Sequence, residues 1–137
     1  QQRLYFVLEA LGKVEALQKK VFAAIDCGLI INPDGVLNQI EGGIIQATSW
    51  TLKEQLQFDR VKITSLNWED YPILTFKEVP QLDIELMNRP HEPALGVGEC
   101  VTGPVSAAIA NAVNCAMGVR VRNLPITQAN VIAAMDL

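Results

Sequence analysis

The chain has 137 residues, of which 50% are hydrophobic and 19% are charged, and its formal net charge is -4. That length fits one domain or part of a larger one, and the apolar content excludes a disordered chain. The scattered lysines and arginines exclude the basic footprint of a nucleic-acid-binding protein. No apolar run approaches the roughly 20 residues that cross a bilayer, so the chain is not expected to span a membrane.

The first residues and the cysteines indicate what kind of protein this chain comes from. The first residues have neither an initiating methionine nor a signal-peptide layout, so we expect a piece of something longer. Cys27, Cys100 and Cys115 are widely spaced and contain no Cys-x-x-Cys pair. Neither a disulfide framework nor a structural zinc site is indicated, and we expect reduced, partly buried thiols.

Two strands are predicted near the start, over residues 4–9 and 14–26. Gly12-Lys13 between them favours a turn, so we expect an antiparallel hairpin. The second strand places apolar residues on one face with a period of two, at Val21, Ala23 and Ile25.

A helix is predicted from about Val36 to Gln55, after four turn-forming residues at 32–35, and Asn38 with Glu41 offers a capping pair. Gly42-Gly43 lies inside it, at a cost of roughly 1 kcal/mol per glycine relative to alanine. Either the glycines allow close packing against another backbone or the helix starts only after them. No phosphate-binding glycine pattern surrounds the pair.

Strands are next predicted over Phe58 to Ser65 and Gln81 to Met87, with an irregular segment at 67–80 between them and a loop at 88–93. Polar and apolar residues alternate in the second of these strands, as in a half-buried strand. No internal repeat or linker interrupts the chain.

Two helices close the chain, which gives an α+β class: mixed or antiparallel strands with two main helices packed on them. The first has Thr102 as a possible cap, Pro104 in its first turn and Gly118 at its end, and Thr127 caps a short C-terminal helix. The longer helix carries an apolar stripe at Val105, Ala108, Ile109, Ala112, Val113 and Ala116.

The segment Gly96-Val97-Gly98-Glu99 holds one carboxylate between flexible glycines and a helix start. Glycines let a backbone approach a ligand closely, and a helix N-terminus attracts anions, so a cofactor and a nearby base would suit this place. The structural alternative is that Glu99 only complements the helix dipole, an effect of about 0.3–1 kcal/mol. The local pattern leaves both open and favours the second.

Other candidate chemistry is weaker. His91 is the only histidine, and its position beside two prolines is typical of a solvated loop residue. Asp26, Cys27 and Asn32 carry ligand atoms, but one histidine and dispersed carboxylates give no recognisable metal spacing. We therefore predict no protein-ligated metal.

Several short strings, in this order and spacing, are similar to one family. The chain resembles the C-terminal molybdopterin-binding region of the large subunit of xanthine dehydrogenase and aldehyde oxidase enzymes, especially the bacterial branch that includes isoquinoline 1-oxidoreductase. The resemblance covers nearly the whole chain. It is carried by AIDCG at 24–28, INP at 31–33, NQIEGGIIQ at 38–46, YPIL at 71–74, GVGE at 96–99, ANA at 110–112 and RVRNLP at 120–125.

This resemblance implies hydroxylation of a heteroaromatic or aldehyde carbon with oxygen from water, with molybdenum carrying the redox chemistry. Glu99 matches the glutamate that acts as base in such enzymes. The resemblance further implies that Gly96, Val97, Gly98 and Cys100 lie against the cofactor, where the protein supplies position and electrostatics. It assigns Asp26, Asn32, Gln39 and Gly42 to supporting positions.

Departures from the family pattern limit how far the roles of the family's residues can be carried over to this chain. Cys100 stands where the family often has proline, Thr102-Gly103 where a proline pair is common, and Ala47 where glycine is frequent. The base is retained, but the shape of the loop around it is in question.

The resemblance also defines what the chain lacks. Residues 1–137 would be a single partial domain, the C-terminal part of the molybdopterin-binding domain, and would bind no molybdenum alone. Expected partners are the remainder of the large subunit, an iron-sulfur subunit or domain, and a small heteroaromatic or aldehyde substrate. The cytosine dinucleotide is the favoured pterin form, and the compartment is open between cytoplasm and periplasm. A non-catalytic interaction module and an inactive family member are the alternatives.

Overall fold

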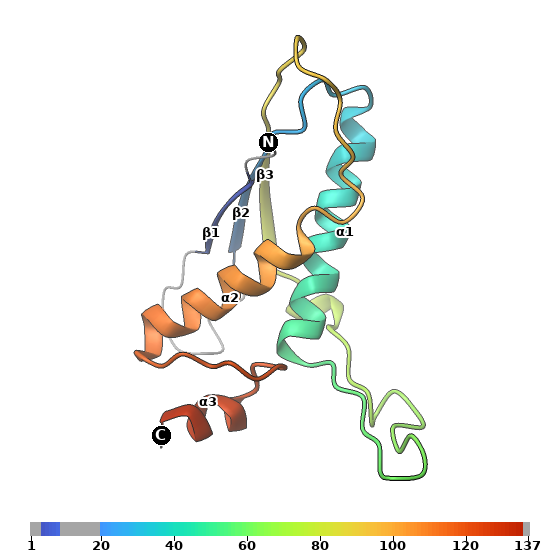
Figure 1. The fold of residues 1–137 in the computed structure, drawn as a ribbon, viewed down its shortest axis with the longest axis vertical. Helices are drawn as coiled ribbons and strands as arrows, with labels where there is room; N and C mark the ends of the chain where they lie inside the picture. The colour runs from blue at the N-terminus through green and yellow to red at the C-terminus, as the bar shows by residue number, and fades with distance from the viewer. Residues whose placement is uncertain (1–3, 9–19, 136–137) are drawn as a thin grey trace.

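The computed structural model describes residues 4–8 and 20–135, and it confirms the α+β class (Figure 1). In chain order the elements are β1 (Leu4–Leu8), β2 (Lys20–Ile25), α1 (Pro33–Leu52), the short 3₁₀ helix η2 (Phe76–Glu78), β3 (Gln81–Leu86), α2 (Thr102–Met117) and α3 (Gln128–Met135).

The strands form one mixed sheet in the order β1-β2-β3. β1 pairs antiparallel with β2, with Leu4 opposite Ile25, and β2 pairs parallel with β3, with Val21 opposite Leu82. The antiparallel pairing agrees with the predicted hairpin, while its turn at Gly12-Lys13 and the predicted strand residues 14–19 lie outside the described residues. The predicted alternation in β2 is confirmed, because Val21, Ala23 and Ile25 are buried.

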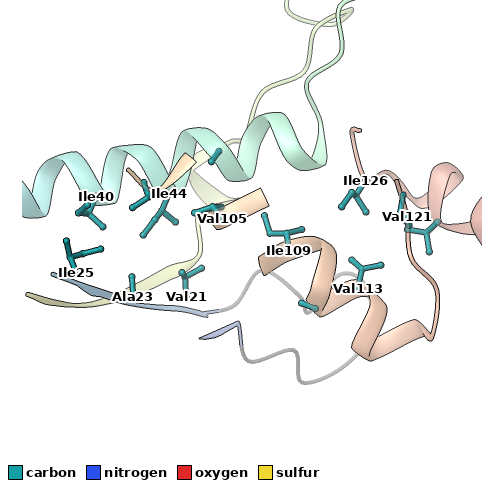
Figure 2. Packing of buried hydrophobic residues seen from close by; sticks show 14 of the residues in the cluster. Val21, Ala23, Ile25, Ile40, Ile44, Val105, Ile109, Val113, Val121 and Ile126 are labelled. Carbon is teal, nitrogen blue, oxygen red and sulfur yellow. The ribbon is translucent and has the colours of Figure 1, made fainter. Parts of the chain in front are cut away.

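The helices pack on this sheet, with α1 against β3 and α2 against β1, and they also contact one another. Figure 2 shows Ile40 and Ile44 of α1 pointing toward Ile25 and Ala23 of β2. Ile40, Ile44 and Ala47 are 0% exposed, so the predicted apolar face of α1 forms the centre of the core. On α2 the buried residues are Val105, Ile109, Ala112 and Val113, whereas Ala108 is half-buried and Ala116 is exposed.

The predicted start of α1 is wrong. The helix begins at Pro33, and the side chain of Asn32 accepts a hydrogen bond from the Gly35 N–H at 3.0 Å. The sequence from 32 to 35 favours turns, but asparagine followed by proline is also a favourable helix cap and first residue. The predicted cap Asn38 is inside the helix, where its side chain donates to the Asp34 carbonyl at 2.9 Å. The alternative start after Gly43 is also wrong.

The two glycines in α1 differ in their surroundings. A Cβ on Gly43 would collide with the Val101 side chain, whereas a Cβ on Gly42 would meet nothing within 4 Å. Close packing is therefore confirmed for Gly43 alone, and its neighbour is a side chain and not another backbone.

The predicted strand from Phe58 to Ser65 is also wrong. Only an isolated bridge between Phe58 and Ile63 forms there, because the chain turns back at Asp59. The Asp59 carboxylate accepts hydrogen bonds from the backbone N–H groups of Val61 and Lys62, at 2.7 and 2.8 Å, and closes the turn. β3 agrees with its predicted strand.

Gly118 ends α2 with a φ of 69°, and the Thr127 hydroxyl accepts from the Asn130 N–H at 3.2 Å before α3, as predicted. Thr102 is not the cap of α2, because it is the first helical residue and Val101 precedes it without a side-chain cap. In the described ranges 4–8 and 20–135, no helix is long and apolar enough to cross a membrane.

Candidate functional site

The predicted site residues lie in the Glu99 loop, which we define as residues 88–101 between β3 and α2. Figure 1 shows this loop returning along the N-terminal half of α1. It contains no regular secondary structure. Its path is fixed by contacts with residues that lie far away in the sequence, and three such attachments can be distinguished.

The first attachment is an ion pair at the start of the loop. Arg89 Nη1 donates to Asp26 Oδ2 at 2.9 Å, and Arg89 Nη2 reaches Glu92 Oε1 at 3.3 Å. Asp26 follows β2 directly and is buried, and its Oδ1 also accepts from the Gly28 N–H at 3.2 Å. The Arg89 guanidinium and the Gly28 N–H hold the pKa of the Asp26 carboxyl below its ordinary value. Asp26 is therefore a charged anchor for the loop.

The second attachment is a pair of backbone hydrogen bonds. The Leu29 N–H donates to the Glu92 carbonyl at 3.1 Å, and the Leu95 N–H donates to the Cys27 carbonyl at 3.0 Å. Gly28 lies between them with a φ of +71°, and a Cβ there would collide with the Pro93 carbonyl oxygen. Glycine is required here by both its conformation and the close approach of the two backbones.

The third attachment holds the end of the loop beside Glu99. Gln39 of α1 donates through Nε2 to the Gly98 carbonyl at 3.3 Å. Val101 is 1% exposed and fits against Gly43 of the same helix. Both contacts lie immediately beside Glu99 in the sequence, so α1 positions the backbone that carries this carboxylate.

Glu99 itself is exposed, just before α2. Its carbonyl accepts from the Thr102 hydroxyl at 3.0 Å and from the Thr102 N–H at 3.3 Å, which fixes the backbone where the helix starts. Among the described residues, none makes a hydrogen bond or an ion pair with the Glu99 carboxylate. This carboxylate is therefore available to an external group.

The other predicted site residues divide into two sets. Gly96 and Gly98 are exposed, and a Cβ on either would meet nothing within 4 Å. Val97 and Cys100 are half-buried and pack against the hydrophobic core. The Cys100 Sγ lies 3.7 Å from the Val97 carbonyl oxygen, and burial raises the pKa of its thiol. The side chains of Val97 and Cys100 thus pack on the core, whereas the two glycines lie at the surface of the loop.

Other candidate ligands do not converge. His91 is exposed, Cys115 is an exposed free thiol and Cys27 is a buried one. In the described part of the chain, no three His, Cys, Asp or Glu side chains are grouped so as to hold a metal ion.

Sequence reasoning did not identify Arg89 as part of the site. It is one of several arginines in the chain, and its partner Asp26 is separated from it by 63 positions. Gln39 matched a family position, but its partner Gly98 lies 59 positions away. No local pattern reports such a pairing.

Comparison with known proteins shows the family to which the chain belongs. Residues 9–80 match the family model for the molybdopterin cofactor-binding domain. The B subunit of nicotinate dehydrogenase from Pseudomonas putida is 46% identical over 121 residues, which is 88% of this chain and 10% of that protein. An aligned stretch that covers 88% of a 137-residue chain necessarily includes Glu99.

Two further relatives extend the match. The beta subunit of isoquinoline 1-oxidoreductase from Brevundimonas diminuta is 36% identical, over 80% of this chain and 14% of that protein. The crystal structure of quinoline 2-oxidoreductase from Pseudomonas putida 86 superposes with a TM-score of 0.76 at 32% identity, over 86% of this chain and 16% of that chain. The chain therefore spans only a small part of each relative. It belongs to the molybdopterin cofactor-binding domain family, within the xanthine dehydrogenase and aldehyde oxidase type of enzymes.

Proposed function

We propose that residues 1–137 are the C-terminal part of a molybdopterin-binding domain and supply the general base for hydroxylation of a heteroaromatic or aldehyde carbon. The observation that carries this proposal is the exposed Glu99 carboxylate on a loop held from three sides. The relatives named for nicotinate, isoquinoline and quinoline support an N-heteroaromatic substrate.

The residues around Glu99 fit a bound cofactor. Gly96 and Gly98 leave open space where other residues would carry a side chain, so a flat or branched ligand can approach their backbone. Val97 and Cys100 keep this short segment packed on the core. We propose that backbone atoms of residues 96–100 lie against molybdopterin, in its cytosine dinucleotide form.

When bound, the cofactor would supply the redox chemistry of the reaction. Glu99 acts separately, because one of its carboxylate oxygens accepts the proton of the water-derived hydroxyl that becomes the new substituent. A general base must lie within hydrogen-bond reach of the proton that it removes. The rigid attachment of Gly98 and Val101 to α1 limits the range over which Glu99 can move, which favours such reach.

Under the proposal, the other parts of the active site and of the electron-transfer chain lie outside residues 1–137. The remainder of the large subunit completes the cofactor site and the substrate pocket, and an iron-sulfur domain or subunit carries the electrons away. This division fits the small share of each relative that the chain matches.

The test is Glu99→Gln in the complete enzyme that contains this chain. We expect turnover to fall by about 10²- to 10⁴-fold, the usual contribution of a general base, with molybdenum and pterin content unchanged. Glu85→Gln is the matched control, because Glu85 is an exposed carboxylate on β3 and should leave turnover unaltered. Equal turnover in the Glu99 variant would exclude the proposed role, and an inactive native enzyme with full cofactor would identify a degenerate family member.

A further inference from the structure

A second segment, the 53–80 arm, connects α1 to β3 and is irregular apart from the short η2. Figure 1 shows it extending away from the body of the molecule, beyond the C-terminal end of α1. It contributes no side chain to the hydrophobic core of the described chain. The arm is nevertheless rich in apolar residues, which calls for a physical explanation.

The arm exposes most of its large apolar side chains. Phe58 and Trp68 are each 74% exposed, Val61 is 91% exposed and Phe76 is fully exposed. Of the sixteen exposed large hydrophobic residues in the described chain, eight belong to the arm. They are Leu56, Phe58, Val61, Ile63, Leu66, Trp68, Ile73 and Phe76. Eight exposed large apolar side chains in one short segment favour a segment that is covered by a partner, and aromatic residues are enriched at the centre of such interfaces.

The arm is shaped by its own polar groups. Asp59 closes one turn, and the Asn67 side chain accepts from the backbone N–H groups of Glu69 and Asp70, at 2.8 and 3.1 Å. The Ser65 hydroxyl accepts from the Gln57 N–H at 2.8 Å. These bonds engage five backbone N–H groups and leave the eight listed apolar side chains exposed. The apolar surface is thus presented on a preformed support, which lowers the entropy cost of binding.

The base of the arm is closed by contacts between its own residues and by a hydrogen bond to α1. Lys53 pairs with Glu78 across the two ends of the arm. The Leu74 N–H donates to the Ser49 hydroxyl at 2.9 Å, and the Tyr71 hydroxyl donates to Glu54 at 2.8 Å. The bond between Leu74 and Ser49 therefore ties the arm to the last turns of the helix.

We propose that the arm docks on an apolar surface of the remainder of its own molybdopterin-binding subunit. The relatives supply the reason for this occupant, since the chain covers only 10% of the nicotinate dehydrogenase relative and 14% of the isoquinoline 1-oxidoreductase relative. The greater part of such a subunit is available to cover the arm. α1 has 20 residues, about 30 Å in length, and separates the arm from the Glu99 loop at its other end.

This interface goes beyond the proposed function, because it depends on the family assignment and not on Glu99. It is tested by hydroxyl-radical footprinting of the complete subunit that contains this chain, without its iron-sulfur partner. We expect Phe58, Trp68 and Phe76 to be oxidised at least about fivefold more slowly than in the urea-unfolded subunit. The protection should be the same across a dilution series over which the subunit remains monomeric by light scattering.

Three results would overturn the inference. Oxidation of these three side chains as fast as in the unfolded subunit would show that nothing covers the arm. Protection that disappears on dilution, together with a halved mass, would identify a second copy as the occupant. Protection that appears only after the iron-sulfur partner is added would assign the surface to that partner.

A variant pair sharpens the test. Trp68→Ser should at least double the oxidation rates of Phe58 and Phe76 in the complete subunit, because it removes apolar contact from the docked surface. Glu69→Ser is the matched control on the same turn and should leave them unchanged. Docking would be contradicted if Phe58 and Phe76 were oxidised at the same rate in both variants and as fast as in the unfolded subunit.

Discussion

The Glu99 loop and the 53–80 arm are both irregular, but they are shaped by opposite means. The Glu99 loop is held by distant residues: Asp26, the Cys27 carbonyl, Gln39 and Gly43. The arm is shaped by short-range bonds from its own polar side chains. A loop anchored to the core can place one carboxylate accurately, whereas a self-supporting arm can hold an apolar surface outward. Substitutions in each region can test this difference.

The largest effect on stability is expected at the glycine beneath the Glu99 loop. Gly28→Ala should lower the free energy of unfolding by about 3 kcal/mol, because the left-handed backbone is unfavourable for alanine and its Cβ collides with the Pro93 carbonyl. Gly42→Ala is the matched control: it lies in a helix with open space around it and should stabilise the protein by up to about 1 kcal/mol. Urea titrations of both variants measure the difference. Similar values for the two would mean that the path of the loop does not depend on Gly28.

Acid should weaken both regions, because each is held by a carboxylate with a lowered pKa. The Lys53 ammonium, with the Thr75 hydroxyl and N–H, lowers the pKa of Glu78 to about 2, from an ordinary 4.5. Arg89 and the Gly28 N–H lower the pKa of Asp26 below its ordinary 3.8.

Because these folded-state pKa values lie below the unfolded ones, each group stabilises the fold above its ordinary pKa, and that stability is lost as the pH falls. For Glu78 the window runs from about 4.5 down to about 2. Glu78→Gln should therefore flatten the decline of stability over this window, as measured by urea titration at a series of pH values. An unchanged decline would show that the Lys53–Glu78 pair does not contribute in solution.

A smaller effect is expected at the contact between α1 and the Glu99 loop. Gln39→Ala should reduce kcat of the complete enzyme by about fivefold, the equivalent of one hydrogen bond of about 1 kcal/mol. KM for the substrate should change little, since Gln39 holds the Gly98 carbonyl and not a substrate group in this structure. Gln46→Ala is the control, because Gln46 is exposed on the same helix. A rise in KM at constant kcat would instead indicate a contact with substrate.

The smallest effect is expected in metal content. The 137-residue chain alone should contain no molybdenum after expression in a host that makes the cofactor, because under the proposed function the other segments that contact the cofactor lie in the remainder of the large subunit. Metal analysis of the purified chain is the measurement. Stoichiometric molybdenum would mean that the chain holds the cofactor by itself.

Much of the fold could be predicted from local patterns. β2 and β3 follow a period of two, and α1 and α2 follow helical periods, because one face of each element is buried. The start of α1 was missed because Asn32-Pro33 suits both a turn and a helix start. The prediction of a strand at 58–65 was wrong because the Asp59 carboxylate takes up two backbone N–H groups and turns the chain.

Less of the candidate site could be predicted from local sequence patterns. Glu99 was proposed from a family resemblance, since its surroundings in the sequence alone favour a helix-dipole contact. The contacts of Asp26 with Arg89 and of Gln39 with Gly98 each join positions about sixty residues apart. Their pairing depends on the parallel arrangement of β2 and β3, which brings the end of β3 beside Asp26, and on the packing of α1 over the sheet.

The proposed role of Glu99 is tested most directly by the rate of a single turnover. The complete native enzyme and its Glu99→Gln variant, matched in molybdenum and pterin content, are mixed anaerobically with excess substrate, and reduction of the cofactor is followed by absorbance. If Glu99 is the base, reduction of the variant is slower by about 100-fold or more. Reduction at the native rate would contradict the role, whatever the steady-state turnover.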